Sequence, residues 1–158
     1  MPVNERDIEW ETIDWGEMHA RRKQLGEAAD GEQLGCSLYE LPPGEEAWPY
    51  HYHTANEEAL FVLAGEGVLR VDGETHTIES GEYAAFPANE SGGHHVSNNG
   101  SEPLRYLVFS TMNEPDISIY PESDKFGVFV GAPPGGRTER SLNGVYNVAD
   151  DVDYWSGE

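Results

Sequence analysis

Residues 44–65 read GEEAWPYHYHTANEEALFVLAG, and this stretch contains two histidines, His51 and His53, with one residue between them. Side chains two residues apart in a strand point to the same face, so the two imidazoles should converge on one side. Glu58 follows after a short polar segment and opens the apolar run 59–64. Because a carboxylate beside two imidazoles suits a divalent transition metal, the stretch predicts a metal site.

A second stretch, residues 81–98, reads GEYAAFPANESGGHHVSN and adds further histidines. A glycine, a proline, a histidine and an asparagine stand in it at Gly81, Pro87, His94 and Asn98. Together, the two stretches resemble the two motifs of the cupin superfamily. The first cupin motif is a glycine, His-x-His, a glutamate and, after six more residues, a second glycine. Its counterparts here are Gly44, His51, His53, Glu58 and Gly65.

The resemblance extends over about residues 35–112 and implies an all-β fold, the antiparallel jelly-roll barrel that is also called the cupin double-stranded β-helix. We expect one domain over residues 1–158, with extra terminal strands packed on the barrel. The resemblance also implies one divalent metal, which would be zinc, iron, manganese or nickel. Its predicted ligands are His51, His53, Glu58 and His94. Three imidazoles and one carboxylate would leave coordination positions open for water or substrate.

The loop of the second stretch departs from the family pattern. Asn89 stands where the motif has a glycine, and residues 88–93 make the connection from Pro87 to His94 two residues longer. The first stretch also has one extra residue after its opening glycine. Because the loop lies at the mouth of a cupin barrel, we expect its length to affect substrate access.

Two of the ligand positions have a neighbour of the same residue type. Glu57 and Glu58 both fit the spacing from His53, but only Glu58 has six residues before Gly65, so Glu58 is the predicted ligand. Glu57 would face the opposite way along a strand.

Among the histidines, His94 and His95 each have an asparagine four residues later. We choose His94 as the ligand, because Asn98 then shares its face of the strand, and we interpret His95 as outward-facing. His19 and His76 are interpreted as surface histidines.

The central region consists of short β-prone runs separated by turn residues, which is typical of a sandwich or barrel. Asp72-Gly73 is a strong hairpin-turn signal between two of these runs. We predict strands over residues 35–41, 59–64, 68–71, 75–78, 83–86, 94–97, 104–111, 117–120 and 126–130. Residues 16–31 fit either one short helix or a strand over 19–25 with a loop after it.

The end of the chain gives weaker signals. Residues 131–136 contain two prolines and three glycines and predict a loop. Residues 150–158 are acidic but include Tyr154 and Trp155, so we expect this segment to dock on the protein.

Charge excludes several kinds of partner. The chain has 30 Asp and Glu against 9 Lys and Arg, a formal net charge of −21. Such a chain repels nucleic acid and anionic membranes. The acids are scattered along a chain that is 37% hydrophobic, which indicates a folded protein with a solvated surface suited to concentrated salt. We therefore expect a halophile's high-salt cytoplasm, since residues 1–10 lack the apolar core of a signal peptide and Cys36 is the only cysteine.

The predicted site favours chemistry on a small molecule. A metal with open positions can polarise a chelating substrate, activate dioxygen or lower the pKa of bound water. We expect a metal-dependent enzyme acting on a small oxygenated metabolite such as a sugar, hydroxy-acid or enediol. The alternative is a non-catalytic metal-containing module that binds or senses a small molecule. The resemblance also implies a homodimer.

The catalytic residue is left unassigned by the sequence. Trp48, Tyr50, Phe86 and Tyr106 lie near the motifs and could contact substrate, although each taken singly fits a place in the barrel core better. Glu90 and Tyr106 are the candidates for a second acid or base beside the metal.

Overall fold

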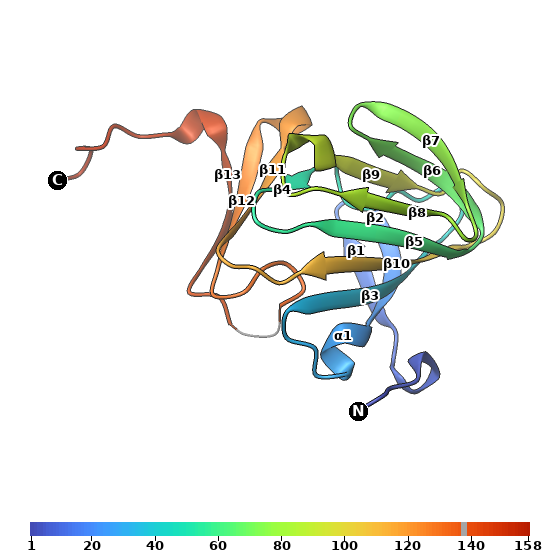
Figure 1. The fold of residues 1–158 in the computed structure, drawn as a ribbon. Helices are drawn as coiled ribbons and strands as arrows, with labels where there is room; N and C mark the ends of the chain where they lie inside the picture. The colour runs from blue at the N-terminus through green and yellow to red at the C-terminus, as the bar shows by residue number, and fades with distance from the viewer. Residues whose placement is uncertain (137–138) are drawn as a thin grey trace.

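The computed structural model describes residues 1–136 and 139–158 and consists mainly of antiparallel strands (Figure 1). The strands are β1 (Glu11–Trp15), β2 (Met18–Gln24), β3 (Leu34–Leu41), β4 (Tyr52–His53), β5 (Glu58–Ala64), β6 (Glu66–Val71), β7 (Glu74–Glu79), β8 (Tyr83–Phe86), β9 (His94–Ser97), β10 (Leu104–Thr111), β11 (Asp116–Tyr120), β12 (Lys125–Val130) and β13 (Leu142–Asn147). The helical segments are η1 (Glu5–Asp7), α1 (Leu25–Ala28), η2 (Glu90–Gly92), η3 (Pro121–Ser123) and η4 (Val148–Asp150).

The strands form three sheets, and two of them enclose the core. A six-stranded sheet has the order β1-β2-β3-β10-β5-β8, and a three-stranded sheet has the order β7-β6-β9. Their inner faces bury Leu60, Val62 and Tyr106 against Leu69 and Val96. Because alternate residues of each strand point inward, the result is the predicted all-β jelly-roll barrel.

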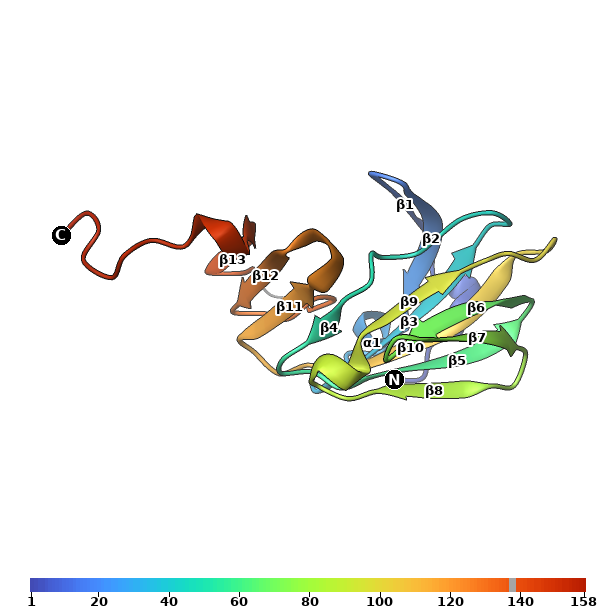
Figure 2. The same cartoon turned by 90° about the horizontal axis from the view of Figure 1, so that it is seen from above.

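A third sheet lies beside one end of the barrel (Figure 2). Its order is β13-β12-β11-β4, so the very short β4 of the His-x-His stretch is its last strand. His53 and Tyr52 on β4 pair with Ser118 and Ile119 on β11. This pairing brings the chain after residue 112 against the predicted metal ligands.

The turns at Asp72-Gly73 and Gly65, which the sequence analysis singled out, have backbone conformations that favour glycine. Asp72 and Gly73 both have positive φ, 48° and 76°, and they connect Val71 to its cross-strand partner Glu74 as a two-residue hairpin. Gly65 also has a positive φ of 83°, and a Cβ there would lie 2.5 Å from the backbone oxygen of Pro103. The glycine that ends the first stretch is therefore required by backbone conformation and by close approach.

All nine predicted strands are present, and the loop over residues 131–136 is confirmed. Of the two readings of residues 16–31, the strand is the better one, since β2 is followed by only a four-residue helix. Strands β1 and β13 were not predicted, because they are short and most of their side chains face solvent, so their sequences show little periodicity.

The end of the chain does not dock as expected. Tyr154 and Trp155 are 85% and 72% exposed, and Figure 1 shows the segment leading away from the barrel. Within residues 1–136 and 139–158, no helix is long and apolar enough to cross a membrane.

Candidate metal centre

Three segments bring the predicted ligands together at the end of the barrel. His51 lies just before β4 and exchanges two backbone hydrogen bonds with His94, at 3.0 and 3.3 Å. His53 belongs to β4, Glu58 is the first residue of β5, and His94 is the first residue of β9. The isolated bridge between His51 and His94 thus fixes two of the histidines directly opposite each other.

The side chains of these residues converge on the carboxylate of Glu58. Its Oε2 lies 3.4 Å from His53 Nε2 and 3.4 Å from His94 Nε2. One nitrogen of His51, one of His53 and one oxygen of Glu58 lie within 4.8 Å of one another. The ring of His51 has its centroid 4.8 Å from that of His94. All three imidazoles are buried, with exposed fractions between 5% and 8%.

Each imidazole is oriented by a hydrogen bond on its other nitrogen. His51 Nδ1 donates to the carbonyl oxygen of Pro49 at 2.8 Å, and His94 Nδ1 donates to that of Gly92 at 2.9 Å. Because carbonyl oxygens only accept, Nδ1 carries the proton in both rings and Nε2 keeps a free lone pair. Such orientation from behind is characteristic of histidines that ligate metals.

His53 has a carboxylate behind it. Its Nδ1 lies 2.6 Å from Asp116 Oδ2, and the hydroxyl oxygen of Ser118 is 3.2 Å from the same nitrogen. The other oxygen of Asp116 accepts the backbone N–H of Ala55 at 3.1 Å. Asp116 is 0% exposed, so its charge is stabilised by these donors and not by water.

Burial and the neighbouring charges shift the pKa values of the ionisable groups in the site. Burial lowers the pKa of His51 to about 3 and also lowers the pKa of His94. Burial alone would lower the pKa of His53 as well, but hydrogen bonds to Asp116 and Glu58 outweigh it and raise that pKa to about 10. Burial opposes the charge of Glu58, yet its hydrogen bond with His53 brings the pKa to about 2. A positive charge is therefore favoured between the two carboxylates.

The lengthened loop of the second stretch helps to orient His94. Residues 90–92 form η2, and the side chain of Asn89 accepts the backbone N–H of Ser91 at 2.8 Å. A Cβ on Gly92 would clash with the Pro87 backbone oxygen, so glycine is needed for this tight path. The loop thereby presents the carbonyl oxygen of Gly92 to His94.

The neighbours of the predicted ligands lie elsewhere. Glu57 is exposed, and its backbone N–H donates to Thr111 Oγ1. His95 points outward, with its Nε2 3.3 Å from Glu46. His19 and His76 are surface residues beside Asp14 and Glu74 at 2.7 and 3.5 Å.

The aromatic candidates are distributed over three places. Phe86 stacks on His94 with ring centroids 3.9 Å apart, so it forms a wall of the site. Tyr106 is 2% exposed and stacks on Tyr39 in the core. Trp48 and Tyr50 line a groove of about 630 Å³ on the outer face of β6 and β9, which contains none of the four predicted ligands. Glu90 is exposed on η2.

Sequence reasoning missed the contribution of β11. Asp116, Ser118 and Tyr120 alternate along this strand, and the ring of Tyr120 stacks on His51 with centroids 5.6 Å apart. Burial raises the pKa of Tyr120. The available signal was the period of two, but it was ambiguous because the polar residues face inward while Ile117 is exposed.

Known proteins match both the barrel and the added strands. Residues 37–110 match the family model of the cupin domain. A solved structure from Acidithiobacillus ferrooxidans, provisionally assigned as a sugar phosphate isomerase, has a TM-score of 0.80 and 25% identity and covers 96% of this chain and 95% of its own. A sugar phosphate isomerase of the cupin superfamily from Silicibacter pomeroyi has a TM-score of 0.79 and 25% identity, with 95% and 94% covered.

A curated relative matches a shorter region. The oxalate-binding protein of Thermotoga maritima is 28% identical over 93 residues, which are 59% of this chain and 74% of that protein. The two isomerase-like structures, in contrast, include the terminal strands, so β11 with its inward carboxylate lies within the region that they share with this chain.

Proposed function

Because the chain is a small protein of the cupin superfamily, we propose that it is a metal-dependent enzyme acting on a small oxygenated metabolite. One divalent ion would be held by His51, His53, Glu58 and His94. The observation that carries this proposal is the convergence of the imidazoles on the Glu58 carboxylate, with each Nδ1 held by an oxygen acceptor. A donor set of three nitrogens and one oxygen fits zinc, iron, manganese or nickel.

Within this class, we favour a sugar-like substrate with neighbouring carbonyl and hydroxyl oxygens. Two structures that match nearly the whole chain are assigned as sugar phosphate isomerases. A bound divalent ion would supply Lewis-acid polarisation of such oxygens. The protein's part is to cover the site with Phe86 and to hold the Nε2 atoms of His53 and His94 beside the Glu58 carboxylate.

We assign to Tyr120 the role of binding the substrate through a hydrogen bond. It lies on the same face of β11 as Asp116 and packs on His51, which places it beside the predicted ligands. Because burial raises its pKa, its hydroxyl keeps its proton at neutral pH and acts as a hydrogen-bond donor. Replacing it by Phe should weaken turnover more than metal binding.

The first experiment is elemental analysis of untagged protein purified in high salt without chelators. About one equivalent of metal is expected for wild type and for Glu57→Ala, and none for Glu58→Ala or His53→Ala. Circular dichroism should show that all variants remain folded. Wild-type protein that holds no metal and takes none up on titration would contradict the proposal. If Glu57→Ala lost the metal and Glu58→Ala kept it, Glu57 would be the ligand in place of Glu58.

The second candidate function is a metal-containing binding or sensing module. It is favoured by the match to an oxalate-binding protein and by the absence of a second buried acid or base, other than the predicted ligands and Asp116, in the described part of the site. Metal-loaded protein can be incubated in deuterated water with aldoses, ketoses and their phosphates. Deuterium incorporation beside the carbonyl, followed by NMR, indicates isomerase chemistry, whereas tight binding without exchange indicates a binder.

We further propose a small-molecule ligand, no nucleic-acid or membrane partner, and a homodimer in the cytoplasm of a halophile. The net charge of −21 supports the first part, since it repels polyanions. The acidic surface supports the salt preference.

A further inference from the structure

The groove on the outer face of β6 and β9 has no role in the proposed function. Its volume is about 630 Å³, within the range of about 300–1,000 Å³ that is usual for small-molecule sites. On β9, the predicted ligand His94 and the core residue Val96 are buried inside the barrel, so His95 and Ser97 between and after them face the groove. The strand therefore separates the groove from the proposed metal centre.

Two tryptophans line this groove. Trp15 lies on the same face of β1 as the core residue Ile13, but it is the last residue of the strand and remains 62% exposed. Its ring centroid lies 5.7 Å from that of Trp48, and the two ring planes are inclined at 57°. A cation in the corner between the rings can lie within about 6 Å of both centroids, the range in which an indole face attracts a positive charge.

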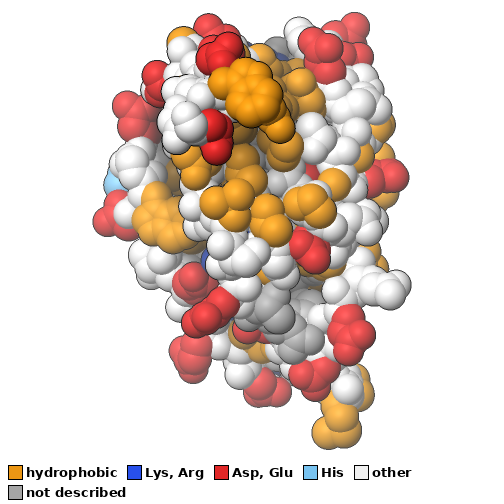
Figure 3. Space-filling model, turned by 90° about the vertical axis from the view of Figure 1, so that its left-hand side faces the viewer, with side chains coloured by type: hydrophobic (Ala, Val, Ile, Leu, Met, Phe, Trp, Pro, Cys, Tyr) orange, Lys and Arg blue, Asp and Glu red, His pale blue; other side chains and the backbone are white. Residues whose placement is uncertain are grey.

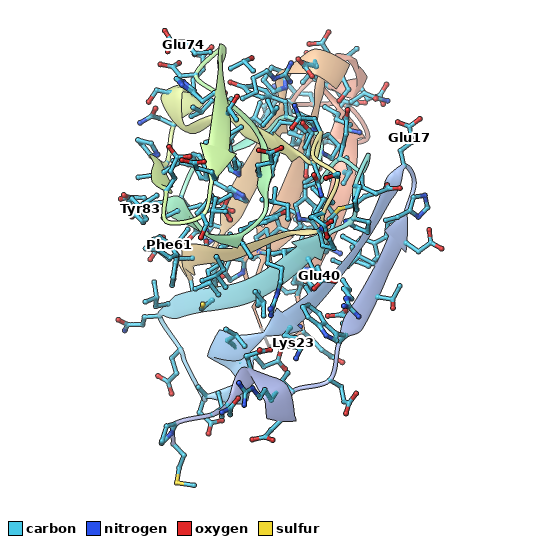
Figure 4. All side chains as sticks on the ribbon, turned by 90° about the vertical axis from the view of Figure 1, so that its right-hand side faces the viewer. Glu17, Lys23, Glu40, Phe61, Glu74 and Tyr83 are labelled. Atoms are coloured by element: carbon cyan, nitrogen blue, oxygen red, sulfur yellow. The ribbon has the colours of Figure 1, made fainter. Side chains whose placement is uncertain are left out.

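The β1–β2 hairpin holds Trp15 and Glu17 beside the groove. Trp15 pairs with Met18 across a two-residue turn, in which Gly16 has a positive φ of 58°. Met18 is 5% exposed and belongs to the core, so it anchors the turn to the barrel. Figure 4 shows Glu17 at the tip of this hairpin. The hairpin thus supplies an aromatic wall and a carboxylate to the same groove.

The charged side chains of the groove favour a cationic ligand. Its lining contains three glutamates, one arginine and one histidine, which are Glu17, Glu46, Glu122, Arg70 and His95. Arg70 is paired with Glu122 at 2.8 Å, and His95 lies 3.3 Å from Glu46. Even if the histidine is counted as a cation, the acids outnumber the basic groups. The groove therefore has a negative potential, which attracts cations and repels phosphates and carboxylates.

One contact between a cation and an aromatic ring is already built into the groove. The guanidinium of Arg70 lies 4.4 Å from the centroid of the Tyr50 ring. This contact occupies Tyr50, whereas the rings of Trp15 and Trp48 have no such partner among residues 1–136 and 139–158. A cation for these two rings would have to come from a ligand.

The terminal arm, residues 151–158, offers aromatic and acidic side chains without a groove around them. Tyr154 and Trp155 are 85% and 72% exposed, with ring centroids 5.1 Å apart. Figure 3 shows hydrophobic side chains gathered on this end of the molecule with Asp and Glu side chains around them. A cation beside rings so exposed would keep most of its water, and such contacts are worth about half as much as desolvated ones or less. The arm is therefore a suitable place for control variants.

We propose that the groove binds an organic cation of the quaternary ammonium type. Its charge would lie near Glu17 and Glu46, and its methyl groups would pack on Trp15 and Trp48. The aromatic corner would distinguish such a cation from potassium or sodium, since a methylated ammonium presents apolar surface that can pack on an indole ring. This site goes beyond the proposed function and does not depend on the metal.

The test uses two probes of the same shape and different charge. Choline carries a trimethylammonium group, and in neohexyl alcohol a carbon atom replaces the charged nitrogen. Titration calorimetry is carried out on the full chain in potassium chloride, at a concentration that keeps the protein folded by circular dichroism. Wild type should bind one choline per chain, and it should bind neohexyl alcohol about tenfold more weakly or less, because the alcohol lacks the charge.

Variants on the two surfaces locate the binding. Trp15→Leu and Glu46→Gln should each weaken choline binding by about fivefold or more, and both positions are exposed, so the fold should be kept. The matched controls are Trp155→Leu and Asp151→Asn, which remove the same kind of ring and the same charge from the terminal arm. Both controls should bind choline as wild type does.

The proposal would be overturned if wild type failed to bind choline or bound both probes equally well. Unchanged choline affinity in both Trp15→Leu and Glu46→Gln would also overturn it. If Asp151→Asn weakened binding as much as Glu46→Gln, choline would be held by the acidic surface as a whole and not by the groove. Choline affinity should be the same for metal-loaded and chelator-treated protein, so failure of this proposal would leave the proposed metal-dependent function untouched.

Discussion

At the scale of single residues, Asp116 has the clearest testable role. Its carboxylate orients His53 at 2.6 Å, and loss of such a partner typically lowers metal affinity about 10–100-fold. We expect this loss for zinc in Asp116→Asn, measured by competition with a chelating dye, together with a changed visible spectrum of the cobalt form. The matched control is Asp14→Asn, which removes an exposed Asp–His pair of 2.7 Å. Equal affinities of both variants would mean that Asp116 does not support the metal.

Also at this scale, metal binding should release about one proton at pH 7. His53 has its pKa raised to about 10, so without metal it is protonated at pH 7. His51 and Glu58 have pKa values near 3 and 2, so they have no proton to lose. The release should persist from pH 7 upward and vanish as the pH passes about 10. Titration calorimetry in buffers of different ionisation enthalpy measures it, and a slope of zero would show that His53 is neutral beforehand.

Single residues also show what sequence reasoning can and cannot reach. His51, His53, Glu58 and His94 could be predicted as ligands from spacing, because candidate ligands of this kind come from short segments with a fixed period. Asp116 could not be found in that way. It lies 63 residues from His53, and only the pairing of β11 with β4 brings the two together.

At the scale of elements, two turn glycines differ in why glycine is needed. One has a positive φ and a close backbone contact, and the other has a positive φ alone. Gly65→Ala combines a positive φ with a Cβ 2.5 Å from the Pro103 oxygen and should destabilise the protein by about 2–3 kcal/mol. Gly73→Ala has a similar φ of 76° but open space around it, and should cost only about 1 kcal/mol. Denaturant unfolding of both variants measures the difference. Equal losses would show that the close approach at Gly65 relaxes without cost.

Burial decides which strands could be predicted from the sequence. Strands with apolar runs, such as β5 and β10, were found because both are buried in the core sheet. Strands β1 and β13 lie at the edges of their sheets and carry mostly exposed side chains, so their sequences have little reason to show a pattern. The contribution of β11 to the site was hidden for a related reason. Its inward-facing residues Asp116 and Ser118 are polar, so the strand lacks the usual pattern of apolar residues toward the core.

At the scale of the whole molecule, the net charge of −21 makes folding dependent on salt. Charges of one sign repel more strongly in the folded state, and the screening length falls from about 30 Å at 0.01 M salt to about 3 Å at 1 M. If screening restores about 2 kcal/mol, the melting temperature should rise by about 4–8 °C between these salt concentrations at constant pH. Calorimetry in potassium chloride measures this rise. Sucrose at matched osmolality is the control, because it favours compact states without screening charge. An equal rise in sucrose, or none in salt, would mean that the acidic surface is not an adaptation to a high-salt cytoplasm.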